Sequence, residues 1–148
     1  MAASRLLERL LKVREMEEEQ SWLALESALQ QLRLLEHAQA AAKERERAGR
    51  RLVEESARSG ELTDRIAGLE ETRAGGRRAT ALVPKIAAAG SATAALRREY
   101  LQRRTSRRQA ETLVEQARAR DETTASRRGQ RALDDWYLSR RRASGERK

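Results

Sequence analysis

The chain has 148 residues, of which 37% are charged and 3% aromatic, and it contains no Phe and no Cys. This composition excludes a globular core of large side chains, a disulfide framework and a thiolate metal site. The single histidine, His37, cannot form a histidine metal site alone. Ala, Leu, Arg, Glu and Gln dominate, and all of them favour helices, so the sequence predicts long α-helices rather than a disordered chain.

The net charge is +9 and is unevenly distributed. Residues 1–59 hold 11 basic and 11 acidic side chains, so the whole excess lies in residues 60–148. Such an excess favours an acidic partner, whether nucleic acid, anionic lipid or a protein face. We expect no membrane span and no secretory signal, because no apolar run approaches about 20 residues and the N-terminus is charged. A cytoplasmic location is the corresponding expectation.

Residues 1–59 are predicted to form the first long helix, since they contain no Pro and only one Gly. Apolar residues recur every three or four positions, which places them on one helical face. Two charged residues interrupt this stripe, and we expect its Trp22 to lie in the core. The stripe consists of Leu7, Leu11, Arg14, Glu18, Trp22, Leu25, Leu29 and Leu32.

Residues 60–78 are predicted to form a glycine-rich hairpin tip with a short helix inside it. Each glycine lowers helix stability by about 1 kcal/mol relative to alanine. The four glycines are Gly60, Gly68, Gly75 and Gly76, and the short apolar set between them is Leu62, Ile66 and Leu69.

The second long helix is predicted over residues 79–142, followed by a frayed basic tail, 143–148. Pro84 is tolerated in a first helical turn, which places the helix start near Leu82 or Val83, or else implies a kink. Steps of four and three residues then continue as a heptad repeat. Its positions are Leu82, Ile86, Ala89, Thr93, Leu96, Tyr100, Arg103, Arg107, Ala110, Val114 and Ala117.

These elements define an all-α fold class. Neither stripe is strongly apolar, so each helix alone would be marginally stable. Folding back at the tip lets each helix cover the other. We therefore expect one domain, 1–148, built as a long antiparallel two-helix coiled-coil hairpin, with a bundle formed by dimerisation as the alternative.

The sequence predicts a protein that is not an enzyme. It has no GxxxxGK[ST], GxSxG or HExxH motif. We therefore assign no catalytic, cofactor-binding or metal-binding residue. The arginine runs alternate with acidic residues and few aromatics, which favours a solvated face or an acidic protein partner over specific nucleic-acid binding. Trp136 and Tyr137 either anchor a partner or staple the helix ends together.

The two ends of the chain resemble the flagellar FliJ family. The opening, RLLERLLKVREMEEEQSWLALESALQQL, is similar to the start of that family, which has a short apolar set before a basic and acidic run. The closing pattern is a polar heptad that ends in an aromatic stretch followed by basic residues. Here it is represented by Leu133, Asp134, Asp135, Trp136, Arg140 and Arg141. Residues 49–95 carry no specific match.

The resemblance implies a stalk of the flagellar type III export apparatus, serving flagellum assembly and motility. Such a stalk inserts into the export ATPase ring, contacts the export gate membrane protein and escorts export chaperones. It would be a monomeric hairpin in the cytoplasm, associated peripherally with the inner face of the membrane through its partners. The implied ATPase-facing end consists of Leu6, Leu7, Leu10, Leu11, Leu133, Trp136, Tyr137, Arg140 and Arg141. The alternatives are the stalk of a virulence-type secretion system and a basic structural or polyanion-binding coiled coil.

Overall fold

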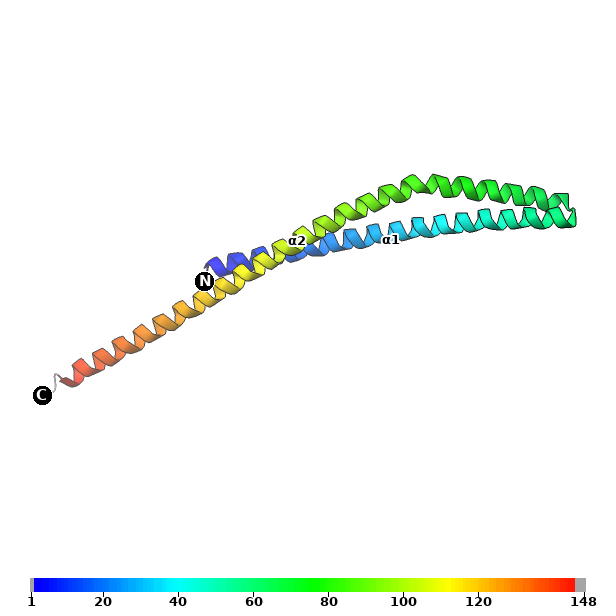
Figure 1. The fold of residues 1–148 in the computed structure, drawn as a ribbon. Helices are drawn as coiled ribbons and strands as arrows, with labels where there is room; N and C mark the ends of the chain where they lie inside the picture. Colours follow the sequence, from blue (N-terminus) through cyan, green and yellow to red (C-terminus); the bar gives the residue numbers. More distant parts are fainter. Residues whose placement is uncertain (1, 146–148) are drawn as a thin grey trace. The chain divides into compact units, whose positions relative to one another are not determined.

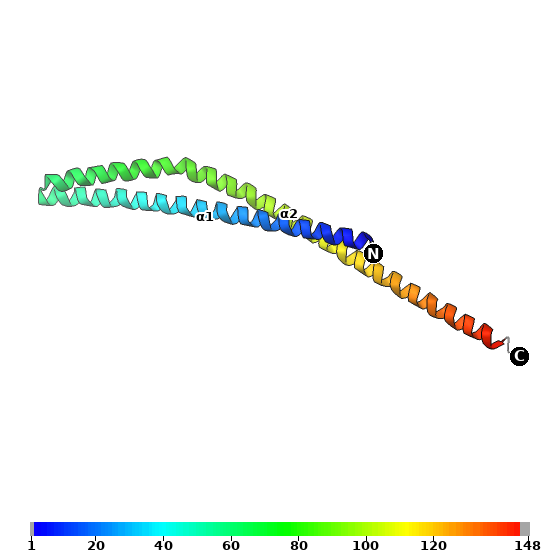
Figure 2. The same ribbon diagram turned by 180° about the vertical axis from the view of Figure 1, so that it is seen from behind.

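The computed structural model describes residues 2–145 as two helices joined by a two-residue turn. Helix α1 spans Ala2–Ser59 and helix α2 spans Leu62–Gly145. The two helices pack against each other as a helical hairpin (Figure 1), and the view from behind shows the same pairing (Figure 2). The predicted all-α hairpin is therefore confirmed.

The turn depends on Gly60, which has a φ of +79°. This left-handed conformation favours glycine, because a Cβ atom would clash with the backbone. The Gly60 amide donates to the Ser56 carbonyl at 2.8 Å and closes the last turn of α1. The glycine-rich tip predicted over 60–78 is wrong, since Gly68, Gly75 and Gly76 all lie inside α2.

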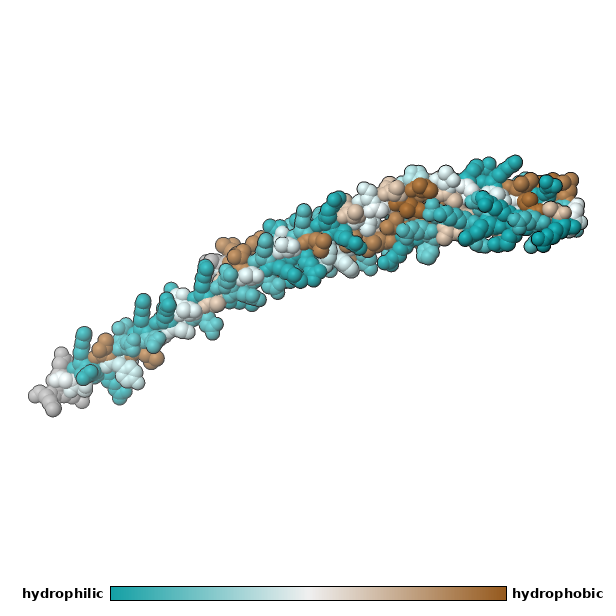
Figure 3. All heavy atoms as spheres, in the orientation of Figure 1, coloured by the Kyte–Doolittle hydropathy of each residue, from teal (hydrophilic) through white to brown (hydrophobic). Residues whose placement is uncertain are grey.

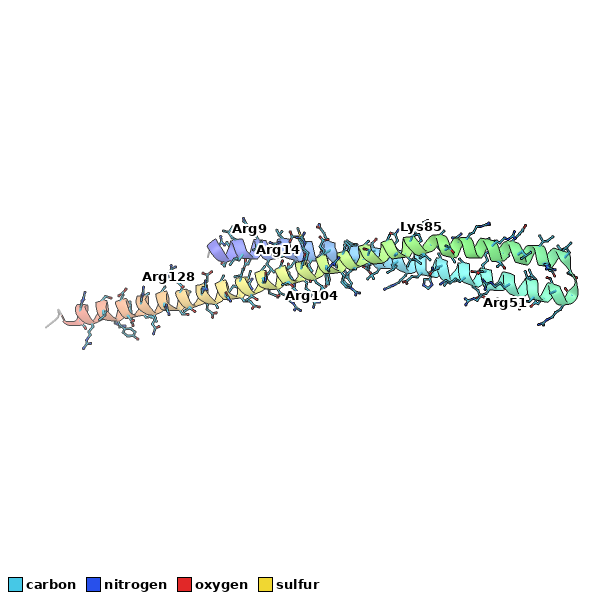
Figure 4. The ribbon with its side chains drawn as sticks, turned by 45° about the horizontal axis from the view of Figure 1, so that its top comes forward. Arg9, Arg14, Arg51, Lys85, Arg104 and Arg128 are labelled. Atoms are coloured by element: carbon cyan, nitrogen blue, oxygen red, sulfur yellow. The ribbon has the colours of Figure 1, made fainter. Side chains whose placement is uncertain are left out.

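Pro84 also lies inside α2. The predicted helix start near Leu82 or Val83 is therefore wrong, and the alternative of a kink agrees with the structure. Helix α2 changes direction in its green part in Figure 1, where Figure 4 places the labelled Lys85. Proline causes such bends because it lacks an N–H group and its ring clashes with the carbonyl one turn back. At the other end, residues 143–145 are helical rather than frayed, and residues 146–148 lie outside the described part.

The contacts divide the hairpin into two packed units. One comprises Met1–Glu19 with Gln102–Lys148, and the other comprises Gln20–Leu101. In the first unit, Ala110 and Val114 are buried. In the second unit the buried residues are mostly small: Ser21, Leu25, Ala42, Gly49, Ser56, Gly68, Gly75, Ala79, Leu82 and Thr93.

The heptad predicted for the second helix is confirmed, because every position from Leu82 to Ala117 in that repeat is buried or half-buried. The stripe predicted for the first helix is shifted at one place. Ser21 is buried, whereas Trp22 is 46% exposed, so the expectation that Trp22 lies in the core is wrong. The repeat runs from Glu18 through Ser21 to Leu25 in steps of three and four, and Trp22 falls beside it. Its ring instead contacts Tyr100, with 5.4 Å between ring centroids.

The face drawn in Figure 3 is mainly hydrophilic with separate hydrophobic patches. One 18-residue stretch of α2 has a mean hydropathy of 1.3 and is, by length and composition only, apolar enough to cross a membrane, and only 17% of it is buried. The expectation that no apolar run approaches that length is therefore wrong. The reason is composition: alanine is the commonest residue in the stretch 79–96, which also holds Leu, Val and Ile and contains one charged residue, Lys85.

Candidate functional site

The predicted N-terminal site residues lie on two faces of α1. Leu7 and Leu11 are half-buried on the seam toward α2. Leu6 and Leu10 are 64% and 38% exposed, and Val13 follows them at 47%. Their spacing of four and three residues gathers Leu6, Leu10 and Val13 on one outer face, here called the N-terminal apolar face. This face is more exposed than the half-buried seam of Leu7 and Leu11.

The predicted C-terminal site residues lie on a stretch of α2 that is exposed throughout. We call residues 122–142 the C-terminal arm, because each of them is solvent-exposed. Leu133, Trp136 and Tyr137 expose 59%, 49% and 65% of their surface. The Trp136 and Tyr137 rings meet edge-on with 5.0 Å between centroids, and the Arg140 guanidinium lies 5.0 Å from the Trp136 centroid. These contacts order the aromatic pair on its own helix.

The N-terminal and C-terminal sets are separate surfaces. An ion pair between Arg118 and Glu8, with 2.9 Å between Nη2 and Oε1, sets the register of this unit. Leu133 lies fifteen residues beyond Arg118 on α2, which corresponds to about 22 Å at the helical rise. The structure therefore does not bring the two predicted sets together into one end.

The apolar face of the arm does not continue the hairpin seam. Extended by heptads, the seam positions Val114 and Asp121 lead to Arg128 and Asp135. Leu133, Trp136 and Tyr137 are turned from that line by roughly 100° to 200°, since successive residues differ by about 100°. A surface with this orientation is left for a contact other than the pairing of α1 with α2.

Charged residues on the seam form an ionic layer in the same unit. Arg107 Nε donates to Glu18 Oε2 at 2.6 Å, and Arg103 Nη1 lies 3.2 Å from Glu17 Oε2. Arg14 Nη1 also donates to Glu17 Oε2 at 2.8 Å, and this hydrogen bond is the main cause of a lowered pKa of Glu17. The charged interruptions of the predicted stripe are thus paired positions rather than defects.

Glycines in the other unit allow close contact of the two backbones. A Cβ atom at Gly75 would lie 2.6 Å from the Glu46 backbone nitrogen, and one at Gly68 would lie 2.8 Å from the Gly49 carbonyl oxygen. Arg45 bridges to Glu71 across the same stretch, with 2.8 Å between Nη2 and Oε1, which lowers the pKa of Glu71. The helices are therefore held tightly together here.

A groove opens further along this unit, in a place that sequence reasoning missed. It encloses about 570 Å³ and is lined by Ala28, Gln31, Leu35, Lys85, Ala88, Ala89 and Ala92. The available signal in the sequence is the run of alanines directly after Pro84. A proline bend followed by short side chains leaves space between paired helices.

The class of molecule defined by this geometry is a coiled-coil-like helical hairpin with exposed apolar faces. Among residues 2–145, no three His, Cys, Asp or Glu side chains gather as a metal site. No protein-family model, no curated protein and no solved structure matches this chain.

Proposed function

We propose that this chain is a non-enzymatic stalk of a type III protein export apparatus of the flagellar kind. In this role its C-terminal arm contacts the export ATPase ring, and other faces of the hairpin contact the export gate and export chaperones. The resemblance of both chain ends to the FliJ family supports the proposal. The virulence-type export stalk is the closest alternative, because it has the same layout.

The single observation that carries the proposal is the exposed arm with its aromatic pair. Trp136 and Tyr137 are two of only four aromatic residues in the chain, yet both are exposed, and their described ring contacts are with each other and with Arg140. Exposed Trp, Tyr and Arg side chains are the residue types that dominate binding energy at protein interfaces. A hairpin that served only as a passive rod would gain nothing from them.

The charge of the arm indicates the kind of surface it meets. Residues 127–142 contain six arginines and two aspartates. Such an excess is complementary to an acidic surface and speeds the encounter with it. The lining of an ATPase ring that accepts this arm is accordingly expected to carry carboxylates.

The test measures binding of the full chain to the purified export ATPase hexamer of the same bacterium at physiological salt. Replacing Trp136 or Tyr137 by Ala is expected to weaken binding by about 30-fold, the effect of losing a central aromatic anchor. Leu34→Ala serves as the matched control, since Leu34 is 69% exposed and lies outside the arm. It should leave the Kd unchanged within about twofold.

Two outcomes would count against the proposal. Equal binding by the Trp136→Ala and Leu34→Ala variants would remove the arm from the interface. Binding only to nucleic acid or other polyanions, with a steep loss on raising salt, would identify the alternative of a basic polyanion-binding coiled coil.

A further inference from the structure

The groove in the unit 20–101 is apolar, open and unoccupied by any side chain of the described hairpin. Its α2 wall belongs to an apolar stretch of α2 with a mean hydropathy of 1.3, of which only 17% is buried. Figure 3 shows this region as a brown patch over the bend of α2. Patches of this kind on soluble proteins mark interaction sites.

We propose that this groove binds an amphipathic α-helix of a partner protein that presents small apolar residues and a carboxylate. The inference does not rest on the proposed export function. It rests on the shape of the groove, its lining and the position of one charge.

The shape fits a third helix. The groove runs between two helices, and four of its lining residues are alanines. A Cβ atom added at the neighbouring Gly90 would meet nothing within 4 Å, so the space beside α2 is open. Short side chains let a helix approach closely, and docking of an amphipathic helix into an apolar groove is a recurrent mode of recognition.

Lys85 specifies the chemistry of the partner. It is the only charged residue between Arg78 and Arg97, and it lines the groove. Within residues 2–145 it forms no ion pair, and no Asp or Glu lines the groove. A helix that covers the alanines would lie beside this ammonium group and reduce its contact with water, which favours a carboxylate on the partner.

The charge of Lys85 argues against a second copy of this chain as the occupant. The composition of the surrounding stretch argues against a lipid surface. A symmetric contact joins identical patches, so two grooves would bring two lysines into one apolar interface without a counter-charge. A helix lying in a membrane interface needs large apolar anchors and several cations, whereas residues 79–96 contain no Trp, Phe or Tyr and a single Lys.

The experiment uses a synthetic 18-residue helical peptide with alanine and leucine on one face and one glutamate beside that face. A twin peptide carries lysine in place of the glutamate. Fluorescence anisotropy with the full chain at physiological salt gives both Kd values. We expect the glutamate peptide to bind at least 10-fold more tightly, and Lys85→Glu to reverse that preference.

A variant with a large side chain in the groove tests whether the peptide binds there. Ala88→Trp is expected to weaken binding of the glutamate peptide at least 10-fold, whereas Ala125→Trp, at an exposed position elsewhere on α2, should leave it unchanged. Far-UV circular dichroism melting confirms that each variant folds.

Several results would overturn the inference. They are no binding of either peptide, equal Kd values for the twins, or binding that survives Ala88→Trp. A dimer in sedimentation that Ala88→Trp dissociates would identify a second copy as the occupant. Binding to phosphatidylglycerol vesicles that the glutamate peptide does not compete would identify a lipid surface.

Discussion

Arg107 and Glu18 form an ion pair across the two helices, although 89 positions separate them in the chain. Their side chains are only 24% and 17% exposed, less than those of the other described pairs. Arg107 also contacts Glu111 on its own helix at 2.8 Å, and the interaction with Glu18 is the main cause of a raised pKa of Arg107. A shift of register by one heptad would leave these half-buried charges unpaired, so the pair selects one alignment of α1 on α2.

Charge reversal tests this role. Glu18→Arg and Arg107→Glu should each lower the Tm by several degrees, because each places like charges together on the seam. The double variant should recover part of the loss, since it restores an opposite-charge pair. A thermal melt of all four proteins by circular dichroism measures the coupling, and purely additive shifts would contradict a direct interaction.

Two Gly→Ala substitutions on the same helix should have opposite effects on stability. Gly75→Ala should destabilise the hairpin by about 1–3 kcal/mol, because its Cβ would lie 2.6 Å and 2.7 Å from backbone atoms of Glu46 and Ala42. Gly129→Ala should stabilise it by about 0.5–1 kcal/mol, because nothing lies within 4 Å and alanine is the better helix former. Urea unfolding measures both, and shifts of equal sign would refute close backbone contact at Gly75.

The Thr93 hydroxyl is buried and has no hydrogen-bond partner among residues 2–145. Thr93→Val keeps the branched shape and removes the unsatisfied group, so it should stabilise the hairpin by about 1 kcal/mol. The control is Thr123→Val on the exposed arm, where the hydroxyl donates to the Ala119 carbonyl at 2.8 Å. That change should stay within about 0.5 kcal/mol in urea unfolding. Destabilisation by Thr93→Val would show that the hydroxyl has a partner in solution.

Acidification should destabilise the hairpin through Glu71. Its pKa is lowered chiefly by a hydrogen bond from Arg45, so its stabilising contribution is present above the ordinary value of 4.5. That contribution is lost as the pH falls through the lower folded pKa. Glu71→Gln should therefore lower the Tm at pH 7 and match the wild type at low pH. A constant difference across a pH series at fixed ionic strength would contradict this linkage.

Replacing a large side chain by alanine should change the free energy of unfolding much less on the C-terminal arm than on the seam. Trp136→Ala should change the free energy of unfolding by less than about 0.5 kcal/mol, since Trp136 is 49% exposed and its described ring contacts are with Tyr137 and Arg140 on its own helix. Val114→Ala should cost roughly 1.5–3 kcal/mol, because Val114 is 2% exposed and its loss leaves a cavity. Urea unfolding compares them. A large effect of Trp136→Ala would mean that the aromatic pair staples the hairpin.

Much of the fold follows from the spacing of residues along the chain. The regular steps from Leu82 to Ala117 predict the buried face of α2, because a heptad defines a seam regardless of residue type. Hydrophobicity alone misplaced Trp22, since the seam position beside it is the small Ser21. The glycines after Gly60 suggest a break in the helix only if their low helix propensity is considered without the opposite helix. Gly68 and Gly75 are retained in a helix because another backbone approaches them, which depends on the partner helix.

The groove was beyond sequence reasoning for a related reason. Its existence depends on how far apart two helices lie at one level, and no single segment encodes that distance. Alanine at Ala88 and Ala92 is compatible with tight contact or with open space. Whether the bend at Pro84 leaves tight contact or open space beside these alanines depends on the position of the opposite helix.

The groove is bounded by two contacts that hold the helices together on either side of it. Toward the turn, the Gly75 backbone meets that of Glu46, and on the other side the Trp22 and Tyr100 rings meet. The groove therefore lies between two interhelical contacts, and these contacts fix the separation of the helices at its two ends. We expect a substitution at either contact to change the width of the groove while every lining residue stays in place, so the affinity proposed for this surface should change without any substitution in the surface itself.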